Sequence, residues 1–326
     1  MAEKKEKLLE VKRLKTYFPL KKGAFKRHVG DIKAVDEVNL TIYKGETLGI
    51  VGESGSGKST LGRTIVKLIN PTAGEIIFEG TDIAAFNNRQ LNSYRKNMQM
   101  IFQDPYASLN PRMTVGQLVE EPMAVQQTLS KKERKEKVLD LLDKVGLTEE
   151  AVKRYPHEFS GGQRQRIGIA RALTLNPKFI IADEPVSALD VSVQSQVLNV
   201  MKDLQEAFQL TYLFIAHDLS VVKHISNRIA VMYLGQIVET GPKEHLYANP
   251  LHPYTKALLD SIPIPKVKRE RKRTKLEGEI PNAADPPSGC PFRTRCPFAF
   301  ERCKVERPKM REVGDEQQVA CHLYPE

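Results

Sequence analysis

The stretch TLGIVGESGSGKST, residues 47–60, predicts the fold around which this chain is organised. Residues 47–51 are mostly apolar and predict a buried strand, and residues 52–60 match the pattern G-x-x-x-x-G-K-[ST] at every fixed position. A strand, a glycine-rich loop and a helix in this order form a phosphate-binding loop, because the loop amides and the helix N-terminus face the phosphate oxygens. The stretch therefore predicts an α/β nucleotide-binding domain.

Single residues of this loop have separate expected roles. Lys58 is expected to reach the β- and γ-phosphates and to act in catalysis, and the Ser59 hydroxyl is expected to bind Mg²⁺. The glycines allow the backbone amides to turn inward onto the phosphates. The predicted nucleotide contacts of the loop are Gly52, Ser54, Gly55, Ser56, Gly57, Lys58, Ser59 and Thr60.

An acidic motif, FIIADEP at residues 179–185, predicts the metal and water side of the same site. Its four apolar residues favour a buried strand that brings Asp183 to its carboxyl end, where Asp183 would face Mg²⁺. Glu184 is the better candidate for polarising the attacking water. Adjacent carboxylates can serve different roles because successive side chains of a strand point apart.

Two further residues follow apolar runs. Gln103 follows residues 98–102, and its amide is a candidate ligand of Mg²⁺ and of the water. His217 follows residues 213–216, where a γ-phosphate contact is feasible. Each signal is weak by itself, since a lone His or Gln is usually an ordinary surface or core residue.

The block FSGGQRQR, residues 159–166, predicts a partner subunit. It has no acid and no metal ligand, but a helix that starts at Ser160 exposes amides to an anion. The chain already has a phosphate loop for its own ATP, so the anion is expected to be the γ-phosphate of a partner's ATP. The predicted contacts are Ser160, Gly161, Gly162 and Gln163. A plain helix cap at Ser160 is the other interpretation, and the two are compatible.

Composition limits the remaining choices. The 326 residues suffice for one large α/β domain and a small appendage, and the formal net charge is +10. Residues 266–275 (KVKRERKRTK) are strongly basic, which is typical of a solvated linker or of a contact with nucleic acid or an anionic membrane. Apolar runs are too short to span a bilayer and the N-terminus lacks a secretory apolar region, so we expect a cytosolic chain.

All four cysteines lie near the C-terminus, at Cys290, Cys296, Cys303 and Cys321. Cytosolic thiols stay reduced, so a cluster of four favours metal ligands over disulfides. The spacing matches neither a zinc finger nor the common ferredoxin patterns. A [4Fe–4S] cluster, zinc and free thiols remain open on this spacing.

Patterning along the chain predicts antiparallel β structure at the N-terminus and then a mostly parallel sheet that alternates with helices. The expected strands are residues 9–14, 34–42, 47–51, 75–78, 179–182, 213–216 and 228–233, with a loop at residues 21–31. The expected helices are residues 60–68, 131–145, 193–208 and 219–225, together with one that opens on Ser160. Proline-rich residues 262–287 mark a boundary before the cysteines.

With these motifs in this order, the chain resembles the ATP-binding-cassette ATPases over roughly residues 8–259. Phe159 stands where Leu is commoner, at a position that packs. The resemblance implies a P-loop NTPase (RecA-like) α/β core with an antiparallel β subdomain, an α-helical subdomain at about residues 104–165 and a small cysteine-containing extension. Residues 1–260 would form the nucleotide-binding domain and residues 261–326 the extension with its basic linker.

The resemblance also implies roles that the residues alone do not give. Tyr17 would stack on adenine, with Phe18 as the alternative. Asp190 would couple the two sites of the dimer, and His217 would sense the γ-phosphate. ATP would lie between Lys58 of one subunit and Ser160 of the other.

A narrower resemblance concerns the peptide and nickel importer ATPases, and within them the "F"-type subunit of oligopeptide and dipeptide permeases. It is carried by residues 102–115, residues 252–259 (HPYTKALL) and the tail from Glu277. It implies a related "D"-type ATPase, two membrane permease subunits and an extracytoplasmic substrate-binding protein as partners. It also implies a peripheral position on the cytoplasmic face of the cell membrane, and it favours a [4Fe–4S] cluster on the four cysteines over zinc.

The predicted function is therefore ATP hydrolysis that energises import of di- or oligopeptides, with nickel also open as cargo. The alternative is a soluble cassette ATPase that acts on nucleic acid or the ribosome. The chain has one cassette and no long heptad region between the phosphate loop and residue 160, which argues against that class, so no nucleic-acid partner is expected. A regulator that does not hydrolyse ATP is disfavoured because Glu184 and His217 are both present.

Overall fold

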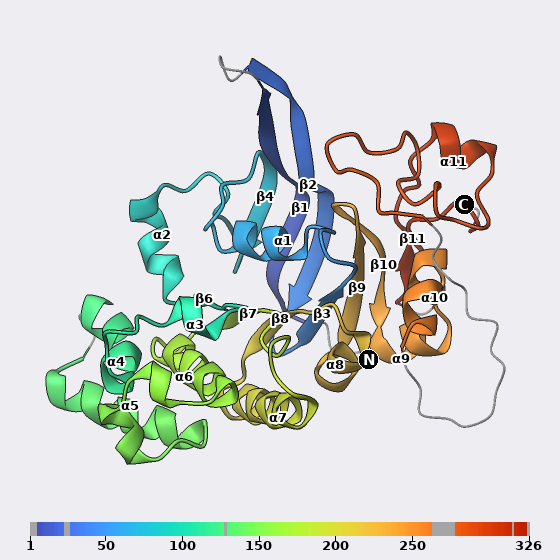
Figure 1. Ribbon diagram of the computed structural model, residues 1–326. Coiled ribbons are helices and arrows are strands. Elements are labelled where there is room, and N and C mark those ends of the chain that lie inside the picture. Colours follow the sequence, from blue (N-terminus) through green and yellow to red (C-terminus); the bar gives the residue numbers. More distant parts are fainter. Residues whose placement is uncertain (1–4, 23–26, 127–128, 263–277, 315, 325–326) are drawn as a thin grey trace, which may run out of the picture. The chain divides into compact units, whose positions relative to one another are not determined.

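The computed structural model describes residues 5–22, 27–126, 129–262, 278–314 and 316–324 (Figure 1). The chain forms two compact units, and each is described by itself. One unit contains residues 43–46 and 86–215, with the first described residues. The other contains residues 7–42, 47–85 and 216–326 and holds the phosphate loop. The basic run at residues 266–275 lies outside the described residues.

The unit with the phosphate loop contains an antiparallel sheet of order β2-β1-β4-β5. Its strands are β1 (Lys7–Lys22), β2 (Arg27–Tyr43), β4 (Ala73–Phe78) and β5 (Thr81–Asp82). β1 pairs with β4, and Leu9 and Val11 are buried at alternate positions of the strand. The pairing register shifts between Lys12 and Lys15, and Leu14, within this irregularity, is buried as well. The loop predicted over residues 21–31 is wrong at both ends, because the strands extend to Lys22 and begin again at Arg27.

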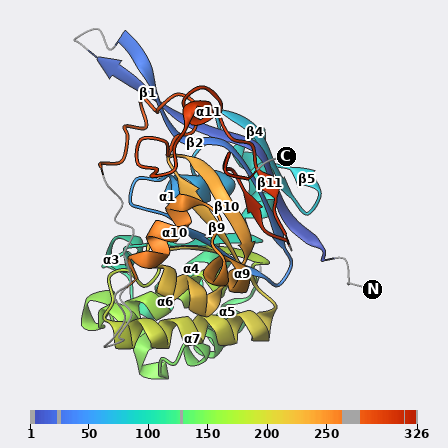
Figure 2. The ribbon, with the colours of Figure 1, turned by 90° about the vertical axis from the view of Figure 1, so that its right-hand side faces the viewer.

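Five more strands of this unit run in the order β11-β12-β10-β9-β3. They are β3 (Thr47–Val51), β9 (Arg228–Tyr233), β10 (Gln236–Pro242), β11 (Arg311–Glu312) and β12 (Gln318–Val319). β3 and β9 are parallel, and the other pairs are antiparallel. The two C-terminal strands thus extend the sheet from β10, and Figure 2 shows the red C-terminal segment beside it.

The helices of this unit are α1 (Lys58–Ile65), α8 (Leu219–Ile225), α9 (Lys243–Ala248), α10 (Pro253–Asp260) and α11 (Glu301–Val305). α1 starts two residues earlier than predicted and ends at Ile65. α8 has the predicted bounds.

The other unit contains the parallel strands β8-β7-β6, which are β8 (Thr211–Ile215), β7 (Phe179–Asp183) and β6 (Met98–Ile101). Every residue of β7 and β8 is buried, which explains their unbroken apolar sequence. The helices are α2 (Asn88–Arg95), α3 (Pro105–Ser108), α4 (Val115–Gln126), α5 (Lys131–Lys144), α6 (Gly161–Leu173) and α7 (Val191–Phe208).

The α/β class, the antiparallel N-terminal sheet and the helical stretch after residue 104 are confirmed. The division into residues 1–260 and 261–326 stays a prediction. Among the described helices, none has both the length and the apolar character that a bilayer crossing requires.

Candidate functional site

The phosphate loop lies between β3 and α1, in the strand–loop–helix context that the motif needs. Gly57 precedes the helix with φ of 103°, and a Cβ there would lie 2.0 Å from the carbonyl oxygen of Ala34. Gly52, with φ of 156°, would place a Cβ 2.1 Å from the carbonyl oxygen of Met232. Both positions therefore require glycine, because the backbone of neighbouring segments closes on the loop.

Lys58 is 4% exposed and its ammonium group is held inside the loop. Its Nζ donates to the carbonyl oxygen of Gly52 at 2.7 Å and to that of Glu53 at 3.0 Å. Helix α1 has no side-chain cap and no acidic residue in its first turn. A cation and an uncapped helix N-terminus together form an anion site, so the loop fits a nucleotide phosphate.

Tyr17, the predicted adenine contact, lies on β1 in the same unit. Its hydroxyl donates to Oδ1 of Asp36 at 2.5 Å, and its ring lies 5.9 Å from Nζ of Lys33. Burial raises the pKa of Tyr17, and Asp36 raises it further. The alternative residue, Phe18, is exposed on the next position of the strand.

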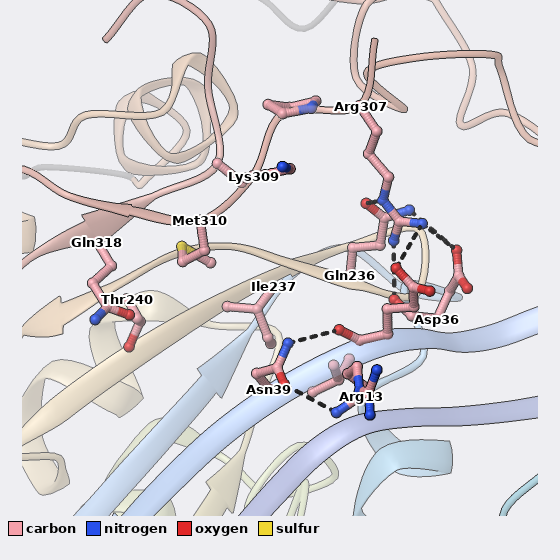
Figure 3. Close-up of a pocket in the computed structure, with 14 residues that line it drawn as sticks. Arg13, Asp36, Asn39, Gln236, Ile237, Thr240, Arg307, Lys309, Met310 and Gln318 are labelled. Carbon is pink, nitrogen blue, oxygen red and sulfur yellow. Dashed lines mark hydrogen bonds and ion pairs between the residues drawn. The ribbon is translucent and has the colours of Figure 1, made fainter. Parts of the chain in front are cut away.

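Asp36 also belongs to a cavity of about 560 Å³ (Figure 3). In it, Arg307 donates to Oδ2 of Asp36 at 3.0 Å and to its carbonyl oxygen at 3.1 Å, and its Nε donates to Gln236 at 3.0 Å. Sequence reasoning did not find Asp36 or Arg307 because 271 positions separate them. Their contact depends on the C-terminal segment returning to β10.

Asp183, Glu184 and Gln103 lie in the other unit. Asp183 is the last residue of β7 and is fully buried. Nε2 of Gln103 donates to Oε2 of Glu184 at 2.8 Å, and the Glu184 amide donates to the carbonyl oxygen of Ile215 at 2.9 Å. Glu184 has φ of 47°, an uncommon conformation for a non-glycine residue, and such residues concentrate at functional sites. The structure thus joins two of the residues that the sequence predicted.

Helix α6 begins after Ser160, as predicted. The Ser160 hydroxyl accepts from the Gln163 amide at 3.4 Å, and the Gln163 side chain accepts from the Ser160 amide at 3.0 Å, which is a capping box. A Cβ at Gly162 would lie 2.3 Å from Cγ1 of Val193, so close packing on α7 requires this glycine. Asp190 stands at the N-cap position of α7.

His217 comes two residues after the end of β8. The preceding residue, Ala216, donates its amide to the carbonyl oxygen of Ile50 at 3.1 Å. Ile50 belongs to β3, the strand that leads into the phosphate loop. The histidine segment is therefore held beside that strand, which agrees with its predicted place at a strand end.

The four cysteines are free thiols, and three of them are buried. Burial raises the pKa of Cys290 to about 12, and the neighbouring Cys303, Cys321 and Cys296 add to the shift. Within the described part of the chain, no group of three or more His, Cys, Asp or Glu side chains is arranged to hold a metal ion. The iron–sulfur prediction gains no support from such an arrangement.

Two protein-family models match the chain. The model described as "ABC transporter" matches residues 35–187, and the model described as "Oligopeptide/dipeptide transporter, C-terminal region" matches residues 238–303. The first match contains the phosphate loop, the capped helix α6 and the acidic strand β7. The second contains most of β10, the HPY sequence at residues 252–254 and three of the four cysteines.

Curated relatives cover nearly the whole chain. The chain is 57% identical to the oligopeptide transport ATP-binding protein AppF of Bacillus subtilis (strain 168), over 99% of each chain. It is 52% identical to the probable peptide ABC transporter ATP-binding protein y4tS of Sinorhizobium fredii, over 97% of this chain and 90% of that one. The nucleic-acid alternative finds no support in these comparisons.

Solved structures agree with the fold. The dimeric post-hydrolysis state of the ATP-binding cassette MJ0796 bound to ADP and Pi is similar, with a TM-score of 0.64 and 31% identity, covering 72% of this chain and 99% of that chain. The two family models thus cover the cassette motifs at residues 35–187 and the C-terminal region at residues 238–303. The chain belongs to the ABC transporter ATPases of the oligopeptide/dipeptide importer type.

Proposed function

We propose that this chain hydrolyses ATP to energise the import of di- or oligopeptides through a membrane permease. The observation that carries the proposal is the match of residues 238–303 to the oligopeptide/dipeptide transporter C-terminal region, joined to a complete set of cassette motifs. Relatives named as oligopeptide and peptide transport ATP-binding proteins support the same cargo class.

In the proposed site, Lys58 and the first amides of α1 bind the phosphates, and Ser59, Gln103 and Asp183 hold the magnesium ion. Mg²⁺ when bound neutralises charge that develops on the phosphate oxygens. Tyr17 supports the adenine, with its hydroxyl fixed by Asp36. The remaining loop contacts are Ser54, Gly55, Ser56 and Thr60.

Glu184 is the proposed general base. Its carboxylate accepts a hydrogen bond from Gln103, and its amide donates one to the carbonyl oxygen of Ile215 at the end of β8. Both the side chain and the backbone of Glu184 are therefore held in place. It would hold the attacking water and accept its proton, while His217 contacts the γ-phosphate.

We further propose that the capped start of α6 serves a partner's ATP and that the partner is a related "D"-type ATPase. A capping box occupies the third amide of the helix, whereas Gly161 and Gly162 offer theirs without a side chain to block an anion. Asp190 would then link the two nucleotide sites of the dimer.

The helical region would receive the two membrane subunits, on the cytoplasmic face of the membrane. A groove of about 480 Å³ on this unit supports the proposal, because it combines apolar and acidic side chains next to Val125, which is 73% exposed. Its lining residues are Met113, Gln117, Glu120, Glu121, Ala124 and Val125. An extracytoplasmic binding protein would deliver the peptide to those subunits.

The four cysteines are proposed to hold a [4Fe–4S] cluster. The thiolates of Cys290, Cys296, Cys303 and Cys321 would be the iron ligands of such a cluster. The proposal rests on the gathering of all four cysteines within residues 290–321, three of them buried. Iron and acid-labile sulfide assays test it, and zinc at one per chain would contradict it.

The function is tested with the complete transporter in lipid vesicles. Glu184→Gln should retain ATP binding and slow hydrolysis and peptide uptake by about 10²–10⁴-fold, as expected for loss of a general base. Peptide uptake that continues at the wild-type rate in this variant would contradict the proposal. Co-purification of the chain with its permease subunits then identifies the cargo class.

A further inference from the structure

The turn that carries the first two cysteines also contains Arg295, which reaches the phosphate loop. Its two terminal nitrogens donate to the two carboxylate oxygens of Glu53, at 2.7 and 3.0 Å. Glu53 is the second residue of the phosphate loop, and 242 positions separate the pair. A fork of this kind fixes direction as well as distance.

Burial makes this ion pair unlike the other arginine pairs of the C-terminal segment. The Arg295 side chain is 5% exposed and that of Glu53 is 26% exposed. Glu53 raises the pKa of Arg295 by accepting its hydrogen bonds. In contrast, Arg302 on α11 and Glu306, the residue that follows this helix, form a similar fork at 2.6 and 3.1 Å, but their side chains are 43% and 46% exposed. Exposed pairs of this type contribute little, whereas removing one partner of a buried pair is costly.

A second route connects the same turn to Glu53. Phe292 is buried, and its ring centroid lies 5.4 Å from that of Tyr254 and 5.2 Å from that of Tyr233. The Tyr254 hydroxyl accepts from the Glu53 amide at 2.8 Å. The turn itself is closed by the Arg295 amide, which donates to the carbonyl oxygen of Phe292 at 3.0 Å.

Glu53 is thus restrained at three points. Its carboxylate is bound by Arg295, its amide by Tyr254, and its carbonyl oxygen accepts from Nζ of Lys58 at 3.0 Å. A carboxylate on a phosphate loop repels the phosphates that the loop binds, unless a cation compensates it. Arg295 compensates this charge from outside the loop.

We propose that Arg295 is a positioning residue of the ATP site, which acts through Glu53 on the phosphate loop and so makes ATP affinity depend on the cysteine turn. The inference rests on the proposed nucleotide site, and it deepens that site by adding a residue from the C-terminal segment. Arg295 itself contacts no substrate. It compensates the negative charge of Glu53 and fixes the position of that side chain beside the phosphate loop.

The test measures equilibrium binding of MgATP to the full-length chain and steady-state ATPase kinetics of the complete transporter. Arg295→Met should raise the dissociation constant and KM for ATP about tenfold and change kcat less than threefold, because the uncompensated Glu53 carboxylate then repels the phosphates while the reacting groups are intact. Arg302→Met, which breaks the exposed fork, should change each value less than twofold.

The deciding variant is Glu53→Gln in the Arg295→Met background. It removes the uncompensated charge, so it should restore most of the lost ATP affinity, which a purely structural role of Arg295 would not allow. Arg295→Lys retains the charge without the fork and should lose about two- to threefold, and it serves if the methionine variant does not fold.

The outcomes distinguish a failure of the proposed nucleotide site from a failure of the role given to Arg295. A wild-type chain that binds no MgATP overturns the proposed site and this inference together. Normal affinity in Arg295→Met, an equal loss in Arg302→Met, or a loss that Glu53→Gln does not recover overturns the inference alone.

Discussion

Two helix N-termini of this protein are proposed to bind phosphate, and they are built in opposite ways. Helix α1 begins after Gly57 without a side-chain cap and has a buried lysine as its first residue. Helix α6 begins after Ser160 with a capping box and has neither an acid nor a lysine in its first turn. An uncapped start with a buried lysine as its first residue attracts an anion by itself, whereas at a capped start one helix amide is already satisfied by the cap. The comparison supports the proposal that α1 binds the ATP of this subunit and that α6 contacts the ATP bound to the partner subunit.

The largest expected effect concerns the cation at α1. Lys58→Ala should lower the ATPase rate of the complete transporter by about 10³-fold and weaken MgATP binding, because the phosphates lose their main positive charge. Nucleotide binding and phosphate release measure it. Near-normal turnover would remove the distinction between the two helix starts.

The next prediction separates capping from phosphate binding at α6. Ser160→Asp keeps a good N-cap, so the melting temperature should stay close to wild type, but its negative charge should lower ATPase activity by about 10²-fold. Ser160→Asn, a neutral cap, is the matched control and should retain more activity. If the aspartate and asparagine variants are equally active, α6 serves only as a capped helix.

A smaller effect tests the glycine before α1. Gly57→Ala should destabilise the fold by about 2–4 kcal/mol, because φ is 103° and the new Cβ would lie 2.0 Å from the Ala34 carbonyl oxygen. Gly55→Ala, with φ of 78° and nothing within 4 Å, is the control in the same loop and should cost about 1 kcal/mol. Chemical denaturation measures both, and equal losses would contradict the close approach.

A third helix start, that of α10, is expected to make the stability of the fold depend on pH. The N-cap of α10 is His252, whose Nδ1 accepts from the Tyr254 amide at 3.1 Å, and burial lowers its pKa to about 3. The unfolded chain therefore binds a proton below about pH 6.5 that the folded chain does not, so stability is present above that pH. Between pH 6.5 and 3 this residue should cost about 1.4 kcal/mol per pH unit.

The measurement is the melting temperature against pH, compared with His252→Asn, which keeps a cap acceptor that does not titrate. The variant should be less stable near neutral pH, because it loses buried ring contacts, but its pH dependence should be flatter. Parallel curves for the two proteins would exclude His252 as the cause.

The motifs could be predicted because each one is local. A strand, a glycine loop and a helix occupy residues 47–65, and the capping box of α6 depends on two residues three positions apart. The bounds of β1 and β2 could not be predicted, because residues 21–22 and 27–31 are mostly polar and their strand conformation depends on the pairing of β1 with β2. The β propensity of single residues predicts strand ends poorly where pairing with a neighbouring strand determines the conformation.

The family, the α/β class and the residues of the nucleotide motifs follow from the order of amino acids, because short-range spacing in a strand, loop or helix fixes which backbone groups face a phosphate. The contacts of Gln103 with Glu184, of Arg307 with Asp36 and of Arg295 with Glu53 exist only in the folded chain. Those pairs are separated by 81, 271 and 242 positions. No local pattern encodes such contacts, since they arise when β10 recruits the C-terminal strands and when parallel strands bring their carboxyl ends to one edge.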